Sequence, residues 1–238
     1  IGGGCSNTVA TEGFVGGGVC NEGSGGYATV VGGGCYNYAT GSSSSILGGH
    51  QLSAAGACST AVGGQCNKAS GKLSTVTGGL SNTAESCFSF IGGGFCNIAT
   101  GLSSFVGGGY TNVASGVASV AGGGRENTAS GTCTVVGGGY NNTASANWAT
   151  VAGGRTNTAS GLSSFVGGGL QNTAARLGSF VGGGKSNVID TSGDCATITG
   201  GTGNCITVLA GTIAGGYYNN VTGGCGTIGG GESNTTNK

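Results

Sequence analysis

The residues of this chain that could do chemistry are few, and their spacing does not bring them together. His50 is the only His, and no Cys or carboxylate stands at a recognisable catalytic or metal-binding spacing from it. Ser is abundant, but none lies in a nucleophile elbow, and one His cannot act as base for many of them. The seven acidic residues form no cluster of the kind found in polysaccharide-active β-helices. We therefore expect no enzyme activity, no metal and no cofactor, with His50 at a surface corner.

Cysteine is the other reactive residue type, with eleven copies and no paired Cys-x-x-Cys spacing of a zinc site. Cys5, Cys20 and Cys35 follow one another at about one repeat length, close to the Cα separation of about 5.5 Å that a disulfide needs. One interpretation is a disulfide within this group, or cross-links between chains in an oxidising setting. The other is a dispersed set of reduced corner residues.

Composition excludes several classes of protein. Of 238 residues, 60 are Gly, none is Pro, and seven basic residues balance seven acidic ones. This is unlike collagen, a flexible linker or an ordinary globular core, and it gives no electrostatic footprint for nucleic acid. No apolar run is long enough to insert in a membrane. The Gly-Gly-Gly runs lack the Lys-Ser/Thr of a phosphate loop, so we expect them to be corners.

A repeat of 15 residues organises the chain. Asn recurs every 15 residues from Asn67 to Asn187 and continues with small slips out to Asn7 and Asn234, with Leu52 in place of one Asn. This gives about 16 copies. Within the unit 104–118, two five-residue segments alternate with period 2, which is typical of strands, and the residues between them are too few for a helix.

The repeat predicts an all-β fold without helices: a parallel β-solenoid (β-roll) of about 16 two-stranded coils with a 15-residue repeat. We expect a single domain over 1–238, with a small insertion loop near 190–203. The interior is expected to hold a β-branched ladder at the position of Val106, an Ala ladder at the position of Ala114, and a ladder of Asn side-chain amides bonded to one another.

The pattern Ser-x-Val-x-Gly followed by Asn-x-Ala-x-Gly resembles the YadA-like head repeats of trimeric autotransporter adhesins, and similar modules occur in viral and phage fibres. The half-coils are also similar to those of grass ice-binding proteins, whose β-roll has Asn-x-Val-x-Gly units. The first resemblance implies a left-handed β-roll that packs as a homotrimer. The second implies a face that binds ice. A shared scaffold supports the architecture better than either function.

Outward residues of the first strand form an apolar stripe that a thin roll cannot bury. An exposed apolar patch of this size is typical of an interface. We therefore expect a homo-oligomer, as a trimer, a lateral pair or a filament, in which uncapped end strands also promote stacking. The alternative is that overhanging loops or the twist of the strand cover the stripe within the chain. The expected interface residues are Phe14, Phe90, Phe105, Val120, Val135, Phe165 and Phe180.

The second strand carries a Thr-x-Ser array that suits an ice lattice, although a solvated β face is the alternative interpretation. The array consists of Thr128, Ser130, Thr143, Ser145, Thr158 and Ser160. Asn141 and Asn220 stand in accessible glycosylation sequons. Adhesion to a surface glycan or protein receptor would use the corner aromatics, which are Tyr36, Phe95, Tyr110 and Tyr140.

These observations predict a non-enzymatic structural or adhesive fibre module at an extracellular, cell or virion surface. It is expected to self-assemble through the Phe and Val stripe, without binding nucleic acid and without membrane insertion. The alternative is an ice-binding β-solenoid.

Overall fold

A computed structural model describes residues 1–190 and 192–237. The described residues form parallel strands in two sheets, stacked as a β-solenoid of about 15 turns, and contain no helix. The predicted fold class is therefore confirmed. The chain divides into two compact units, unit 1 (1–118) and unit 2 (119–238), each of which is described by itself.

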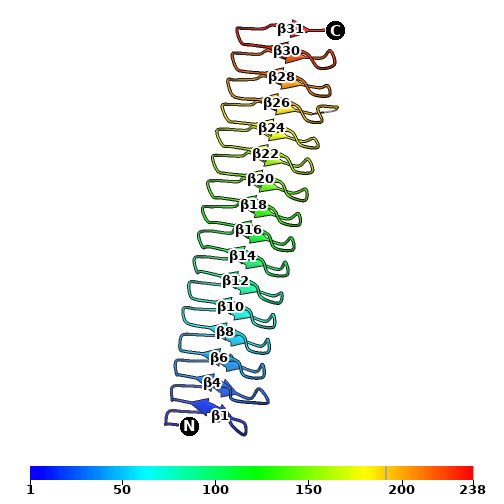
Figure 1. Cartoon of the computed structure of the whole chain (residues 1–238). Coiled ribbons are helices and arrows are strands. Elements are labelled where there is room, and N and C mark those ends of the chain that lie inside the picture. Colours follow the sequence, from blue (N-terminus) through cyan, green and yellow to red (C-terminus); the bar gives the residue numbers. More distant parts are fainter. Residues whose placement is uncertain (191, 238) are drawn as a thin grey trace. The chain divides into compact units, whose positions relative to one another are not determined.

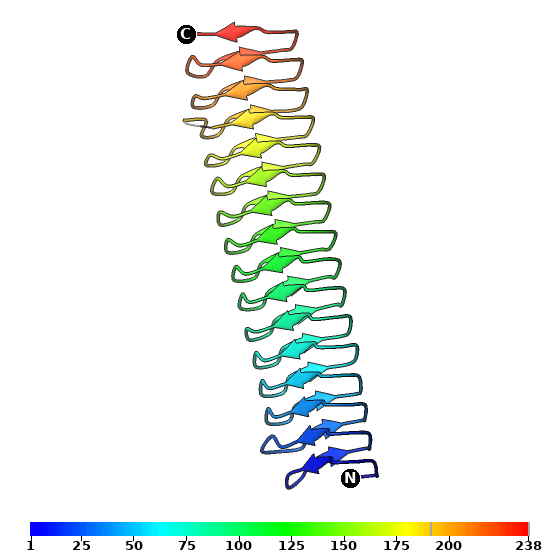
Figure 2. The same cartoon turned by 180° about the vertical axis from the view of Figure 1, so that it is seen from behind.

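Each coil follows the same path, which Figure 1 shows from one side and Figure 2 from behind. An even-numbered strand leads into a corner rich in glycine, here called the Gly corner. An odd-numbered strand and a second corner then complete the coil. In unit 2, for example, β18 (Val135–Val136) is followed by the Gly corner 137–142, β19 (Thr143–Ala144) and the second corner 145–149. Among the described residues, odd strands pair with odd strands and even strands with even ones, in parallel.

In unit 1 the strands of the odd sheet are β1 (Thr8–Val9), β3 (Glu22–Gly23), β5 (Tyr38–Ala39), β7 (Ser53–Ala54), β9 (Lys68–Ala69), β11 (Thr83–Ala84), β13 (Ile98–Ala99) and β15 (Val113–Ala114). Those of its even sheet are β2 (Phe14–Val15), β4 (Val30–Val31), β6 (Ser45–Ile46), β8 (Thr60–Ala61), β10 (Thr75–Val76), β12 (Phe90–Ile91) and β14 (Phe105–Val106).

In unit 2 the strands of the even sheet are β16 (Val120–Ala121), β18, β20 (Thr150–Val151), β22 (Phe165–Val166), β24 (Phe180–Val181), β26 (Thr197–Ile198), β28 (Thr212–Ile213) and β30 (Thr227–Ile228). Those of its odd sheet are β17 (Thr128–Ala129), β19, β21 (Thr158–Ala159), β23 (Thr173–Ala174), β25 (Val188–Ile189), β27 (Cys205–Ile206), β29 (Asn220–Val221) and β31 (Thr235–Thr236).

The strands are only two residues long, shorter than the five-residue segments expected from the alternation. Backbone hydrogen bonds between coils nevertheless continue into both corners. Ser145 N–H donates to the Ala159 carbonyl at 3.0 Å, and Tyr140 N–H donates to the Gly154 carbonyl at 2.9 Å. The parallel hydrogen bonding between coils therefore extends well beyond the named strands.

The insertion is confined to the second corner between β25 and β26. Ile189 pairs with Ile206, and Ile198 pairs with Ile213 at the regular 15-residue spacing, so residues 198–203 belong to an ordinary coil. Of the insertion itself, Thr191 lies outside the described residues.

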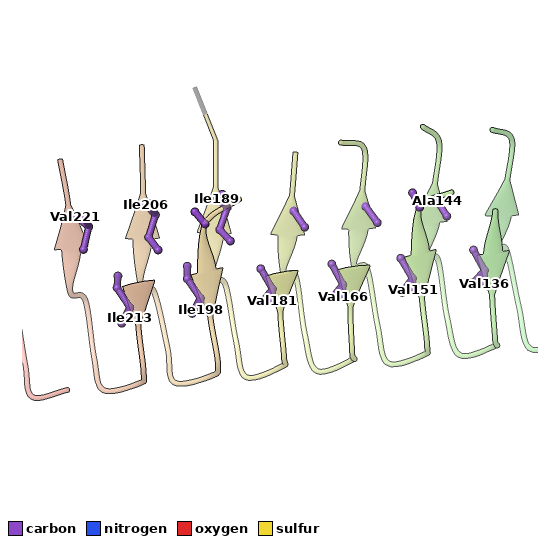
Figure 3. Close-up of a cluster of buried hydrophobic side chains, with 14 of the residues drawn as sticks. Val136, Ala144, Val151, Val166, Val181, Ile189, Ile198, Ile206, Ile213 and Val221 are labelled. Atoms are coloured by element: carbon purple, nitrogen blue, oxygen red, sulfur yellow. The ribbon is translucent and has the colours of Figure 1, made fainter. Parts of the chain in front are cut away.

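The interior consists of two facing rows of inward side chains, as predicted. Figure 3 shows them in unit 2, with Val136, Val151 and Val166 on the even sheet opposite the odd-sheet row that contains Ala144 and Ile189. All five of these residues are fully buried. Burying one Val or Ile side chain contributes roughly 1.5–3 kcal/mol, so the ladders supply the main stabilisation of a thin fold.

Buried Asn side chains stabilise the Gly corner by hydrogen bonds to the backbone. This hydrogen-bond pattern differs from the expected ladder of amides bonded to one another. Asn142 Nδ2 donates to the carbonyls of Gly138 and Gly154, both at 2.9 Å, and Asn142 Oδ1 accepts the backbone N–H of Asn157 at 2.9 Å. Direct contact between amides occurs at some steps, such as Asn82 to Asn67 at 3.2 Å. The Gly residues turn their carbonyls toward the side-chain amide, so the backbone is its main partner.

Gly is required directly before this network. Gly139 and Gly154 have φ of 93° and 88°, a backbone conformation that favours Gly. A Cβ on Gly154 would collide with the carbonyl oxygen of Gly169 and lie 2.6 Å from Nδ2 of Asn157. The last Gly before the bridged residue of this corner is therefore required both by its backbone conformation and by the lack of room for a Cβ.

Candidate interaction surfaces

The outer face of the even sheet carries the predicted apolar stripe. Phe14, Phe105 and Phe180 are 54%, 40% and 38% exposed, and Phe90 and Phe165 are partly buried. In-register pairing stacks the rings within each unit: Phe90 lies on Phe105 with centroids 5.4 Å apart, and Phe165 lies on Phe180 at 5.3 Å. The stacked rings form exposed apolar patches on the surface of each unit.

The rest of the stripe is less continuous than the sequence implied. Val120 and Val135 pair in register in unit 2, but Thr150 lies between Val135 and Phe165 in the same row. All three of Val120, Val135 and Thr150 are partly buried. Within this stripe, the stacked Phe pair of each unit is therefore the closest apolar contact.

Four Phe residues of the stripe each cover a Gly two residues later on the same face: Phe14, Phe90, Phe165 and Phe180. Cε1 of Phe165 would lie 3.4 Å from a Cβ on Gly167, and Cε1 of Phe180 would lie 3.4 Å from a Cβ on Gly182. Larger residues at the Gly position follow only a short side chain, in the pairs Ser45 and Leu47, Thr60 and Val62, Thr75 and Thr77, Thr150 and Ala152, Thr197 and Thr199, and Thr212 and Ala214. A ring that shields the backbone at a strand glycine is a known source of sheet stability.

The outer face of the odd sheet carries the Thr-x-Ser array in unit 2. Thr128 pairs with Thr143, Thr143 with Thr158, and Thr158 with Thr173, in one parallel register. Ser130, Ser145 and Ser160 are exposed beside this row, and the Thr side chains are partly buried. Thr173, which was not among the predicted residues, extends the row by one coil.

The Gly corner forms a column of side chains along each unit, one per coil, joined by parallel bridges. In unit 1 the predicted aromatics lie in this corner: Phe95 stacks on Tyr110 with centroids 5.0 Å apart, and Tyr36 meets the edge of His50 at 6.2 Å. In unit 2, Tyr140 is flanked by the guanidinium carbons of Arg125 at 5.5 Å and Arg155 at 5.6 Å. Tyr140 was expected at this corner from the sequence, and the two Arg residues that flank it were not.

The three Cys residues considered for a disulfide occupy two different columns. Cys5 bridges Val19, which in turn bridges Cys35, so a whole coil separates Cys5 from Cys35. Cys20 lies beside this column, and its backbone N–H donates to the Cys5 carbonyl at 2.9 Å. All eleven Cys are free thiols in the structure. A disulfide within this group of three stays a prediction.

The two sequon residues differ in accessibility. Asn141 is exposed in the Gly corner, whereas Asn220 lies on β29, partly buried, with a buried side-chain oxygen. Asn141 is therefore the better placed acceptor for a glycan.

The insertion loop is held by an ion pair. Nε of Arg176 donates to Oδ1 of Asp194 at 3.0 Å, and both side chains are partly exposed. The Asp194 carboxylate thus already has a cationic partner from the preceding second corner.

Within the described ranges 1–190 and 192–237 there is no detectable pocket and no group of three or more His, Cys, Asp or Glu residues that could hold a metal ion. The same residues include no helix of the length and apolarity needed to cross a bilayer. The candidate sites are therefore surfaces.

A scan of the chain against models of protein families and a search among curated proteins both found no match. The fold defines a parallel β-solenoid protein. The resemblance to adhesin heads and to grass ice-binding proteins continues to depend on the repeat pattern alone.

Proposed function

We propose that this chain is a structural or adhesive fibre module of an extracellular, cell or virion surface, and that it self-assembles through its outward Phe and Val residues. The observation that supports this most is the pair of stacked, partly exposed Phe rings on the even sheet of each unit. A surface of this kind, on a fold that offers no enclosed site among its described residues, favours work done by assembly and by a repeated surface.

Association gains free energy by covering the exposed part of the Phe rings. Fully burying a Phe side chain contributes roughly 1.5–3 kcal/mol, and Phe90, Phe105, Phe165 and Phe180 are already more than half buried, so covering the rest supplies a few kcal/mol per chain. That offsets part of the entropic cost of bringing two or three chains together. A trimer around a shared axis and a lateral pair both cover the same rings.

The test is the oligomeric state, measured by light scattering during size-exclusion chromatography. We expect the unmodified chain to be a homo-oligomer at micromolar concentration, and Phe105→Ser combined with Phe165→Ser to give smaller species. The matched control is Ile98→Ser on the odd sheet, because Ile98 is 38% exposed and equally apolar. A monomeric unmodified chain, or equal dissociation by the Ile98 variant, contradicts assembly through the Phe stripe.

Ice binding is the second candidate, supported by the in-register row of Thr128, Thr143, Thr158 and Thr173. A flat parallel sheet holds such side chains at two regular spacings, about 4.8 Å between coils and about 6.6 Å along a strand. Changing Thr128, Thr143 and Thr158 to Lys should abolish any thermal hysteresis. The control changes Thr197, Thr212 and Thr227 on the even sheet to Lys. An unmodified chain without hysteresis or ice shaping excludes this candidate.

A further inference from the structure

Three of the seven basic residues of the chain lie in one column of unit 2. Parallel bridges join Arg125 to Tyr140, Tyr140 to Arg155, Arg155 to Leu170, and Leu170 to Lys185. Cations and uncharged residues therefore alternate strictly. Since one coil advances about 4.8 Å, the cations stand about 10 Å apart along the Gly corner.

The backbone of this column is held by hydrogen bonds, and its charged side chains are exposed. Backbone N–H groups of Arg125, Tyr140 and Arg155 donate to Gly carbonyls of the next coil at 2.8–2.9 Å. Arg125, Arg155 and Lys185 are exposed. The guanidiniums of the two Arg lie over the Tyr140 ring, which holds them in place without neutralising them.

Acidic residues reduce this charge only at one end. Glu126 accepts a hydrogen bond from Nε of Arg125 at 2.9 Å, and in the part of the chain that the structure describes no ion pair involves Arg155 or Lys185. Beside the column runs a parallel row of neutral polar residues: Asn141, Thr156, Gln171 and Ser186. Their amides and hydroxyls suit the hydroxyl groups of sugars.

We propose that this column, Arg125 to Lys185, binds a linear anionic polysaccharide with sulfate or carboxylate groups about 10 Å apart. Arg presents a planar fork that matches sulfate and carboxylate, and Lys185 adds a point charge. Duplex DNA, with one charge per about 1.7 Å, demands far denser cations than this column offers. The proposal names the partner of the adhesive role described above and rests on that part of the proposed function.

The test uses a chondroitin sulfate oligosaccharide, with neutral dextran as a control, and titrates binding by calorimetry between about 50 and about 200 mM salt. We expect Arg155→Ser combined with Lys185→Ser to weaken binding at least tenfold and to reduce the slope of log K against log salt by about two. Lys68→Ser combined with Lys72→Ser removes the same charge elsewhere and should leave affinity within twofold.

The same titration is repeated on the Phe105→Ser, Phe165→Ser chain, so that failure to bind and failure to assemble are seen separately. The proposal is overturned if the unmodified chain does not bind the oligosaccharide at about millimolar concentration. It is also overturned if the Arg155, Lys185 variant and the Lys68, Lys72 variant lose affinity equally. Equal binding of short single-stranded DNA or of phosphatidylserine vesicles overturns it too, because the column would then not select a polysaccharide.

Discussion

The side-chain oxygen of Asn142 accepts the backbone N–H of Asn157 at 2.9 Å, one coil further along the chain. The same side chain donates to two Gly carbonyls, so a single Asn satisfies three backbone groups at the Gly corner. Buried backbone groups without partners cost about 1–3 kcal/mol each, which makes this Asn a strong determinant of stability.

Asn142→Leu should therefore lower the free energy of unfolding by about 2–3 kcal/mol, because the Gly138 carbonyl and the Asn157 N–H lose this partner, whereas the Gly154 carbonyl keeps the N–H of Tyr140. The opposite change is available in unit 1, where the fully buried Leu52 stands in an Asn position and offers no acceptor to the Asn67 N–H. Leu52→Asn should stabilise by about 1–2 kcal/mol. Urea unfolding followed by circular dichroism measures both, and a destabilised Leu52→Asn variant contradicts the explanation.

A buried Ser hydroxyl directly before an even strand should contribute to stability in one coil and not in another. Ser164 Oγ is buried without a partner, and Ala149 and Ala196 occupy its position in other coils. Ser179 Oγ, at the same position, donates to the Arg176 carbonyl at 2.7 Å. We expect Ser164→Ala to be neutral or slightly stabilising and Ser179→Ala to cost about 1 kcal/mol. Equal thermal shifts for the two variants would contradict this.

Phe165 and Gly167 should be energetically coupled. Gly167→Leu sets its Cβ against the Gly182 carbonyl of the next coil and sends the rest of the side chain toward the Phe165 ring, so it should cost about 1–3 kcal/mol. Combining it with Phe165→Ser recreates the natural pair Ser45 and Leu47, so the double variant should be more stable than the sum of the single changes by at least about 0.5 kcal/mol. Gly167→Leu combined with Phe14→Ser, from unit 1, serves as the additive control. Additivity in both cycles would refute the coupling.

The thiol of Cys205 should react more slowly with alkylating reagents than the thiol of Cys133. Burial raises the pKa of Cys205 above the ordinary value, and the nearby charge of Asp190 raises it further. The folded chain therefore favours the neutral thiol of Cys205. The contribution of this thiol to stability is fully present below the pKa that it has in the unfolded chain, and it is lost as the pH rises through the raised pKa of the folded chain. In single-Cys variants near pH 8, alkylation of Cys205 should be slower than that of the exposed Cys133.

Asp190→Asn provides the check on this thiol. It should lower the Cys205 pKa and accelerate alkylation of Cys205 without changing the rate at Cys133. If Cys205 and Cys133 react at one rate across the pH range, measured by mass spectrometry of quenched samples, the assignment is wrong.

The repeat alone was enough to predict the coil and its interior, because burial on one face of a strand enforces period 2, as at Val106 and Val136. It did not predict the partners of Asn142, since these depend on how the Gly138 carbonyl is turned in the corner. The cations at 125, 155 and 185 share one place in the repeat and could have been found from their spacing. Their stacking on Tyr140 depends on side-chain conformations that spacing does not specify.

The hydrogen bonds of each coil to its neighbours have a mechanical consequence. Thr143 and Ser145 bond to Asn157 and Ala159 in the next coil. A unit pulled at one end would thus detach coil by coil, each time releasing 15 residues, or roughly 50 Å of contour length. The force trace of a stretched unit would be a regular sawtooth, and the fold would dissipate work over many small, equal steps.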